Sequence, residues 1–393
     1  MRKLQRIHLW LPEIFSTKGG IQTYSDFLLK ALRAQLPQTE IHVFLKHDLP
    51  HAVQNHDGGQ TYFHCAGAWP GSSRTAIFAA QILARGFWQR PDLIIASHLN
   101  FSVAARHLKL SARVPYWVAA HGVEAWGITR PSLKRSLRHA ERILAVSNYT
   151  RDRLLTEQQL DPAQVVILPN TVDAERFTPA PKPPRLLERF NLSPQQPVIL
   201  TVSRLVSSAQ YKGYEKVIRA LPAIRQAIPD VRYILVGKGD DRERIEQLID
   251  HLGVRDCTTL AGFVADEELA DYYNLCDVFA MPSKREGFGI VFLEAMCCGK
   301  PTLAGNKDGS VDALLNGELG ALVDPDDVEA VAATLVAILL GSYPHQLMYQ
   351  PELLRQKMCE IYSFEQFKRH LSAHLASFKA PGERLQAQNI ARG

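Results

Sequence analysis

The chain has 393 residues, of which 46% are hydrophobic, and a formal net charge of +5. This length is enough for two domains, each with its own hydrophobic core. The six cysteines form no C-x-x-C pair and no metal-ligand spacing with histidine, and no apolar run reaches the roughly 18 residues that span a bilayer, so the sequence disfavours a metal-thiolate protein and a membrane-spanning one.

Residues 7–11 form the first predicted strand. The glycine-containing run from Lys18 to Tyr24 follows it and opens a predicted helix through Leu32. Backbone amides at such a helix start suit a phosphate or another oxygen-rich ligand, so Gly19 and Gly20 are candidate binding residues. Turn geometry alone also explains a Gly-Gly pair, and the pair is therefore not diagnostic.

A second candidate follows a predicted strand over residues 116–120, which ends at His121. Histidine at a strand end can serve catalysis or structure, and the pattern alone does not separate the two.

Strand and helix patterns alternate along most of the chain, which predicts two doubly wound, Rossmann-like parallel sheets. The proline-rich segment 179–188 predicts a stiff linker between a first domain of residues 1–178 and a second of residues 189–361. A further helix is predicted within residues 362–380, and a disordered tail over residues 381–393.

In the second half, Arg204 and Lys212 follow an apolar, β-branched run that reads as a buried strand. Ligands bind at the carboxyl edge of open α/β sheets. A guanidinium that grips two phosphate oxygens, with an ammonium beside it, would offset the charge on a departing nucleoside diphosphate.

Two carboxylates complete this pattern. Glu286 lies in the loop after the predicted strand 278–283, and Glu294 lies in the helix that restarts near Gly289. Carboxylates accept hydrogen bonds from vicinal hydroxyls, and a helix amino terminus favours anions. Alone, either glutamate is as well explained as a loop or helix-end charge, but together with Arg204 and Lys212 they indicate a nucleotide-sugar site.

A dinucleotide-binding alternative is tested by Gly237-Lys238-Gly239-Asp240. The third glycine of the G-x-G-x-x-G pattern is missing, because residue 242 is arginine, and the run does not follow the first strand. A dehydrogenase is therefore disfavoured.

The Arg204 and Lys212 pair, the segment from Glu286 to Glu294 and its continuation to Pro301, and Gly19-Gly20 occur in an order that resembles the retaining glycosyltransferases of family 4 (glycosyl transferases group 1). The resemblance covers nearly the whole chain. It implies the GT-B fold, in which two Rossmann-like domains face each other across a cleft, with the helix of residues 362–380 crossing back to the first domain.

By this resemblance Arg204 and Lys212 bind the donor diphosphate, Glu286 contacts the donor sugar, and Glu294 contacts the ribose. His121 matches a catalytic-site histidine that contacts the donor sugar, so the expected catalytic residues are His121, Arg204, Lys212 and Glu286. Gly237 matches the base-side loop. The remaining expected donor contacts are Gly20, Phe263, Val264, Gly287, Phe288, Gly289 and Ile290. Where relatives often carry a glutamate in the loop after the next strand, this chain has Asp312, whose role stays open.

The resemblance implies transfer of a sugar, with retention, from a nucleoside-diphosphate sugar to an acceptor hydroxyl, in glycan or glycolipid synthesis and without a metal cofactor. A UDP-sugar is favoured over a GDP-sugar. The acceptor is a sugar, a sugar-phosphate (as in sucrose-phosphate synthases) or a lipid-linked glycan. A non-catalytic nucleotide-sugar-binding protein is the alternative of another class.

Charge bears on the acceptor. Of the 45 lysines and arginines and the 40 acidic residues, residues 1–180 hold 21 and 13, so this part carries +8 and the remainder −3. A basic first domain favours an anionic partner, for which Gly19, His121, Arg142 and Arg151 are acceptor candidates. No nucleic-acid partner is expected. The amphipathic segment 132–142 predicts either contact with an acidic membrane surface or packing on the core, and the expected location is the cytoplasm, with the inner membrane surface as its peripheral alternative.

Overall fold

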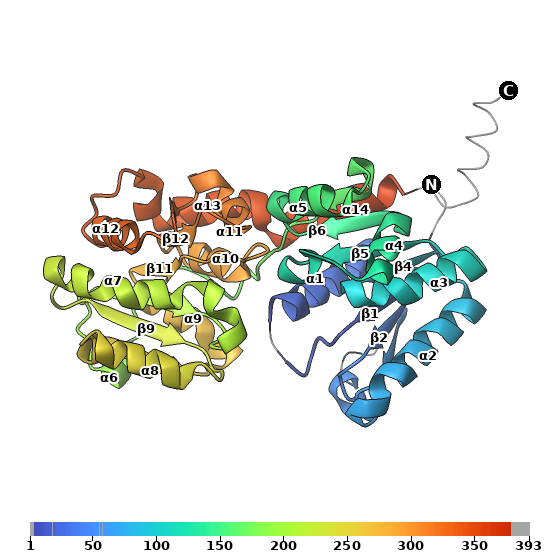
Figure 1. Cartoon of the computed structure of the whole chain (residues 1–393), viewed down its shortest axis with the longest axis horizontal. Coiled ribbons are helices and arrows are strands. Elements are labelled where there is room, and N and C mark those ends of the chain that lie inside the picture. The colour runs from blue at the N-terminus through green and yellow to red at the C-terminus, as the bar shows by residue number, and fades with distance from the viewer. Residues whose placement is uncertain (1–3, 18, 55, 57, 379–393) are drawn as a thin grey trace. The chain divides into compact units, whose positions relative to one another are not determined.

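The computed structural model describes residues 4–17, 19–54, 56 and 58–378. The chain divides into two compact units, one made of residues 1–170 with 365–393 and the other of residues 171–364. Each unit contains one parallel β-sheet with helices on both of its faces (Figure 1). The two sheets confirm the predicted α/β class.

The first unit contains a seven-stranded sheet in the order β3-β2-β1-β4-β5-β6-β7. Its strands are β1 (Arg6–Leu11), β2 (Glu40–Leu45), β3 (Thr61–Cys65), β4 (Leu93–Ala96), β5 (Tyr116–Ala120), β6 (Arg142–Ala145) and β7 (Val165–Ile167). Its helices are α1 (Gly20–Gln35), α2 (Gly71–Gln89), α3 (Ser102–Ala112), α4 (Pro131–His139), α5 (Asn148–Gln158) and α14 (Phe364–Ala376). The strands are nearly continuous apolar runs because both faces of a parallel sheet are covered.

Helix α14, the last described helix, belongs to the first unit although the whole second unit precedes it in sequence. Phe367 and Leu371 are buried, and the Phe367 ring lies edge-on to Tyr24 of α1 with 5.7 Å between centroids. Arg142 at the start of β6 donates from Nη1 to the carbonyl oxygen of His374 over 2.7 Å. The helix is thus part of the first unit's core.

The second unit contains a six-stranded sheet in the order β10-β9-β8-β11-β12-β13. Its strands are β8 (Val198–Val202), β9 (Arg232–Val236), β10 (Thr258–Gly262), β11 (Val278–Met281), β12 (Thr302–Gly305) and β13 (Ala321–Val323). Its helices are α6 (Pro184–Phe190), α7 (Tyr214–Ala227), α8 (Arg242–His251), α9 (Asp266–Leu275), α10 (Ile290–Cys297), α11 (Ser310–Ala313), α12 (Val328–Leu339) and α13 (Pro351–Tyr362).

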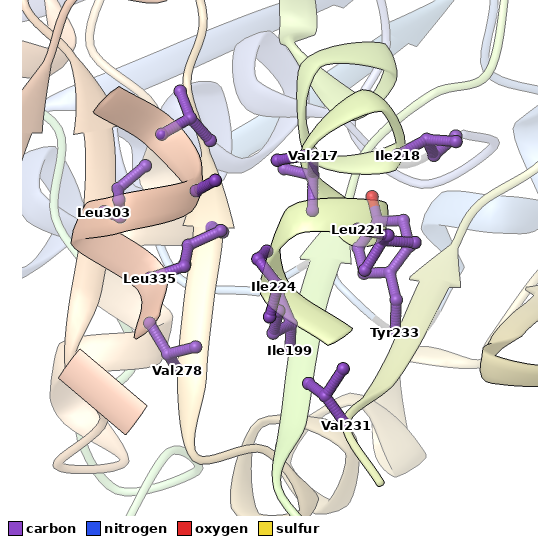
Figure 2. Packing of buried hydrophobic residues seen from close by; sticks show 14 of the residues in the cluster. Ile199, Val217, Ile218, Leu221, Ile224, Val231, Tyr233, Val278, Leu303 and Leu335 are labelled. Atoms are coloured by element: carbon purple, nitrogen blue, oxygen red, sulfur yellow. The ribbon is translucent and has the colours of Figure 1, made fainter. Parts of the chain in front are cut away.

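The core of the second unit fills the space between α7, α12 and the sheet. Figure 2 shows Val217, Leu221 and Ile224 of α7 directed at apolar side chains of the strands and of α12, including Ile199 and Leu335, all of them buried. This packing fixes β8 and β11 as neighbours, with Val278 paired to Ile199. Strands β8 and β11 therefore end side by side at the carboxyl edge.

The division between the units falls after Asn170, not at the proline-rich segment 179–188 predicted as the linker. That segment is held within the second unit, where the Ala180 amide donates to Asn274 and the Lys182 ammonium lies 2.7 Å from an Asp277 carboxylate oxygen. Pro184 is the first residue of α6. Proline at the first helical position favours the start of a helix, so the prolines of this segment precede and begin α6 and do not form a linker. The tail 381–393 lies outside the described residues.

Candidate functional site

The carboxyl edge of each sheet has a point where strand order reverses, between β8 and β11 in the second unit and between β1 and β4 in the first. Such points are the usual ligand sites of doubly wound sheets. Apart from Arg142, the predicted donor and acceptor residues divide between these two edges.

In the second unit, the loops after β8 and β11 are held together by backbone contacts. The Lys284 amide donates to the Tyr211 carbonyl over 2.9 Å. Gly213 has a φ of +84°, and a Cβ at this position would lie 2.1 Å from the Pro282 carbonyl oxygen. Only glycine allows this approach, which places Lys212 beside the loop that carries Glu286.

Lys212 and Glu286 form an ion pair, and only 8% of Glu286 is exposed. The Glu286 amide donates to an Asp308 carboxylate oxygen over 2.7 Å, and its carbonyl accepts from the Gly309 amide over 2.8 Å. A lysine ammonium has three donors, so it can hold Glu286 and still donate to a phosphate oxygen. The predicted cation and carboxylate are thus brought into one cluster.

Asp308, which was not predicted from the sequence, holds this cluster in place through hydrogen bonds. Its buried carboxylate also accepts from Ser283 Oγ over 2.7 Å and from the Ser310 amide over 3.0 Å. Burial raises the pKa of the Asp308 carboxyl, and these hydrogen bonds oppose the rise. Asp312, the residue whose role was open, instead offers its backbone carbonyl to the Tyr362 hydroxyl.

Glu294 lies in the second turn of α10 and is half-buried. The Tyr273 hydroxyl donates to its Oε2 over 2.6 Å. Burial raises the pKa of the Glu294 carboxyl to about 6, although the Tyr273 hydrogen bond acts in the opposite direction. The Glu294 carboxylate is therefore oriented by Tyr273 and titrates close to neutral pH.

Arg204 is exposed, and its guanidinium has no hydrogen bond or ion pair to any residue in the described part of the chain. Helix α10 starts after Gly289, at φ +91°, without a side-chain cap. Uncapped amides at a helix amino terminus and an uncommitted guanidinium are both suited to phosphate oxygens.

The other predicted donor contacts are of two kinds. Phe263 is 64% exposed and lies 4.7 Å from the Lys238 ammonium, measured to the ring centroid. Val264 and Phe288 are buried, and Phe288 packs edge-on against Tyr362. Their side chains cannot meet a ligand without a rearrangement, so only their backbones remain available. Gly237 follows β9, whereas Gly287 and Ile290 flank the α10 start.

In the first unit, His121 directly follows β5 and its ring is fixed on two sides. Nε2 lies 2.7 Å from the Ser97 carbonyl oxygen, and since a carbonyl only accepts, Nε2 carries the hydrogen. The ring meets Tyr24 edge-on with 4.9 Å between centroids, and the His121 amide donates to Glu124 Oε1 over 2.6 Å. In the neutral ring, Nδ1 is then the acceptor left for a ligand hydroxyl.

Gly19 and Gly20 begin α1 at the end of a loop that a buried carboxylate organises. Asp48 accepts from the Ile14 and Ser16 amides over 2.7 Å each, and its role was not predicted. Helix α1 follows β1, so its amino terminus lies at the carboxyl edge of the sheet. It has no side-chain cap, and its first amides therefore remain available to a ligand.

Of the two arginines predicted as acceptor contacts, the prediction for Arg142 is wrong. Arg142 lies at the amino end of β6, the opposite edge from His121, and binds α14. Arg151 lies in the first turn of α5 at the carboxyl edge, paired with Asp152. The apolar side chains of α4, Leu133 and Leu137, are buried, which agrees with packing on the core rather than an exposed membrane-facing helix.

Across the described residues no group of three or more histidine, cysteine or acidic side chains is arranged to hold a metal ion. Nor does any helix in the described ranges combine the length and apolar character that crossing a membrane requires.

Two Rossmann-like sheets with these edge sites define the GT-B class of fold. HepE of Anabaena in complex with UDP superposes with a TM-score of 0.77 at 20% identity, over 95% of this chain and 100% of that one. Sucrose-phosphate synthase from Thermosynechococcus elongatus gives 0.75 at 22% identity, over 99% and 100%.

Family models match consecutive parts of the sequence: Glycosyltransferase Family 4 over residues 18–176 and Glycosyl transferases group 1 over residues 185–350. The chain belongs to the family 4 glycosyltransferases. A GDP-mannose-dependent alpha-(1-6)-phosphatidylinositol monomannoside mannosyltransferase of Mycolicibacterium smegmatis is 36% identical over 234 residues, 56% of this chain and 60% of the relative. One of the same name from Mycobacterium tuberculosis H37Rv is 33% identical over 252 residues, 61% and 64%. The chain thus spans less than two thirds of either relative.

Proposed function

We propose that this chain is a retaining glycosyltransferase that moves a sugar from a nucleoside-diphosphate sugar to an acceptor hydroxyl. The observation that carries the proposal is the ion pair between half-buried Lys212 and buried Glu286, whose loop Asp308 holds at the strand-order reversal of the second sheet. A buried ion pair at an edge site is costly to maintain unless it serves specificity or a ligand. Membership of the glycosyltransferase family supplies the ligand class.

In the proposed reaction, Arg204 and Lys212 hold the diphosphate and stabilise the negative charge that grows as the sugar–phosphate bond breaks. Glu286 orients the sugar through its hydroxyls, and Glu294 accepts from the ribose. His121 Nδ1 accepts a hydrogen bond from a donor-sugar hydroxyl. The acceptor hydroxyl attacks on the face from which the phosphate departs, and the leaving phosphate takes its proton, so the configuration is retained. No strong side-chain base and no metal is required.

For the donor, we propose GDP-mannose first. The relatives at 36% and 33% identity are named for GDP-mannose, whereas the neighbour bound to UDP is 20% identical. A UDP-sugar, the choice favoured by the sequence alone, is the alternative.

For the acceptor, the charge of +8 over residues 1–180 supports an anionic molecule. A phosphoinositide-type glycolipid fits the names of the mycobacterial relatives, and a sugar-phosphate fits that of a mannosylfructose-phosphate synthase from Agrobacterium fabrum at 26% identity. We place the glycolipid first because of the higher identity.

The test is a thermal shift of the purified chain with GDP, UDP, ADP, GDP-mannose, UDP-glucose and NAD. A ligand at a hundred times its dissociation constant adds roughly 2.7 kcal/mol of stability, a shift of a few degrees. A shift with GDP and GDP-mannose that Arg204→Ala abolishes supports the proposal. No shift with any diphosphate, or a shift with NAD alone, contradicts it.

Glu286→Gln then separates an enzyme from a binding protein. In an enzyme this variant still binds the nucleotide but loses transfer, and the anomeric configuration of the wild-type product, read by NMR, tests retention. Unchanged transfer would contradict the role given to Glu286.

A further inference from the structure

Helix α2 of the first unit has a solvent-facing side made of apolar residues. Ala76, Ala80, Ala84, Phe87 and Trp88 follow one another at helical spacing and are all exposed. Trp88 is 80% exposed and Phe87 46%. We call these five residues the α2 face.

Such a face departs from what a surface helix normally shows, which is polar side chains toward solvent. Helix α8 follows the rule, since its exposed positions include Arg242, Glu243 and Gln247. Helix α2 already buries its other side, where Phe78 and Ile82 join the core and Gly86 lies against Leu108 of α3. In Figure 1, α2 lies at the margin of the first unit beside α3. The apolar residues of the α2 face are therefore not needed for the fold.

The charge around the α2 face is of one sign. No aspartate or glutamate occurs between residues 58 and 91, whereas Arg74, Arg85 and Arg90 lie on or next to α2. Arg85 and Arg90 are exposed. Another exposed aromatic residue, Trp69 at 49%, lies just before the helix. Tryptophan and arginine beside an apolar stripe are the composition of helices that lie in the interface of anionic membranes.

We propose that the α2 face docks on an anionic lipid surface, with Phe87 and Trp88 inserted at headgroup depth and the arginines against the lipid phosphates. A second copy of this chain suits the face less well. In a twofold interface the same surface meets itself, which would bring the arginines of both copies together without acidic partners from this segment. The α4 segment, the other basic helix of the first unit, has its leucines buried and offers no comparable face.

This inference deepens the proposed function, on which it rests for the idea that the acceptor is carried by a lipid. It goes further in naming the surface that brings the enzyme to that acceptor.

The test is flotation of the full chain with vesicles of phosphatidylcholine alone and with added phosphatidylglycerol, without donor or acceptor. Wild type floats with the anionic vesicles only. The double variant Phe87→Ser, Trp88→Ser loses at least about tenfold in vesicle affinity. The variant Arg85→Gln, Arg90→Gln loses about fivefold for each arginine, and added salt has the same effect.

Leu340→Ser is the matched control, because Leu340 is 62% exposed but lies in the second unit. It floats as wild type does. An unchanged melting temperature and unchanged nucleotide binding show that the variants are folded.

The proposal is overturned if wild type does not float with anionic vesicles, or if the aromatic double variant floats equally well. It is also overturned if light scattering shows a dimer that the double variant dissociates, because the face then binds a second copy. Nucleotide binding without vesicle binding leaves the proposed function standing and removes only this surface, whereas vesicle binding without nucleotide binding removes the proposed function.

Discussion

The two edge sites of this protein are built in different ways. In the second unit, charged side chains hold one another: Lys212 pairs with Glu286, and Asp308 binds the backbone of the same loop. In the first unit, the candidate site consists of uncapped amides at the start of α1 and one oriented ring, His121. A site made of interlocked side chains depends on particular residue types, whereas a site made of backbone depends on chain geometry.

The difference predicts how each site responds to substitution. In the second unit, loss of one group should disturb its partners as well as the ligand. In the first unit, loss of a side chain should affect the transfer rate and leave stability and nucleotide affinity unchanged. The following measurements test that contrast, starting from the largest effect.

Arg204→Ala and Lys212→Ala should each lower the transfer rate by about 10²–10³-fold, because each removes a cation from the leaving diphosphate. Only Lys212→Ala should also lower the melting temperature, since it leaves Glu286 buried without its partner, at a cost of about 3 kcal/mol. Steady-state kinetics and thermal unfolding measure both effects. Arg242→Ala, which changes another exposed arginine of the second unit, should alter neither, and a rate unchanged in Arg204→Ala would count against the diphosphate site.

Asp308→Ala should destabilise the second unit by about 3 kcal/mol, because the Glu286 amide and the Ser283 hydroxyl lose a buried acceptor. Chemical denaturation followed by fluorescence measures the loss. Asp250→Ala provides the control: Asp250 is paired with Arg255 on the surface, where solvent screens the pair, and its removal should cost far less than that of Asp308. Equal losses in the two variants would mean that Asp308 does not brace the loop.

His121→Ala should lower the transfer rate about tenfold, the value of one hydrogen bond to the reacting sugar, with nucleotide affinity unchanged. Kinetics and calorimetric titration with the nucleoside diphosphate separate these quantities. His107→Ala, at an exposed position of α3, should leave both unchanged. A fall in nucleotide affinity for His121→Ala would contradict the division of roles between the two edges.

The smallest expected effect concerns Glu294 and pH. Since burial raises the pKa of its carboxyl to about 6, the group is mainly protonated at pH 5 and ionised at pH 7. An ionised carboxylate accepts hydrogen bonds from ribose hydroxyls better than a protonated one, so nucleotide affinity should rise severalfold as pH increases through about 6. Calorimetry of wild type and Glu294→Gln removes the contribution of the phosphates, which titrate alike in both. Parallel pH curves would refute the Glu294 contact.

The position of Arg204, Lys212 and Glu286 at the carboxyl edge of the second sheet could be predicted from sequence, because each lies in the segment that follows an apolar strand. Buried parallel strands can be recognised as apolar runs, and ligands bind at the carboxyl ends of such strands. Asp308 could not be predicted from sequence, because its role depends on burial and on hydrogen bonds from four donors that only the folded loop brings together. Its position in the sequence is equally typical of an aspartate in a surface turn.

In the first unit, the sequence correctly placed Gly19, Gly20 and His121 at the carboxyl ends of strands, but Arg142 lies elsewhere. Arg142 is the last residue of the amphipathic segment 132–142, and the sequence does not show at which edge of the sheet that residue lies. Arg142 starts β6 and so lies at the amino edge. Asp48 organises the loop before α1 by accepting hydrogen bonds from backbone amides. Such contacts form only in the folded chain, so Asp48 could not be predicted from the sequence.

The return of α14 to the first unit has a consequence for how the molecule is made. Phe367, Leu371 and Leu375 are buried in a unit whose other strands and helices end by residue 170. On the ribosome, the first sheet is synthesised early, but its last helix emerges only after the whole second unit, so the apolar side chains that α14 covers, Tyr24 among them, lack that cover for most of translation. A fragment that stops at Asn170 lacks α14 and leaves those side chains uncovered, which makes it a poor choice for expression on its own.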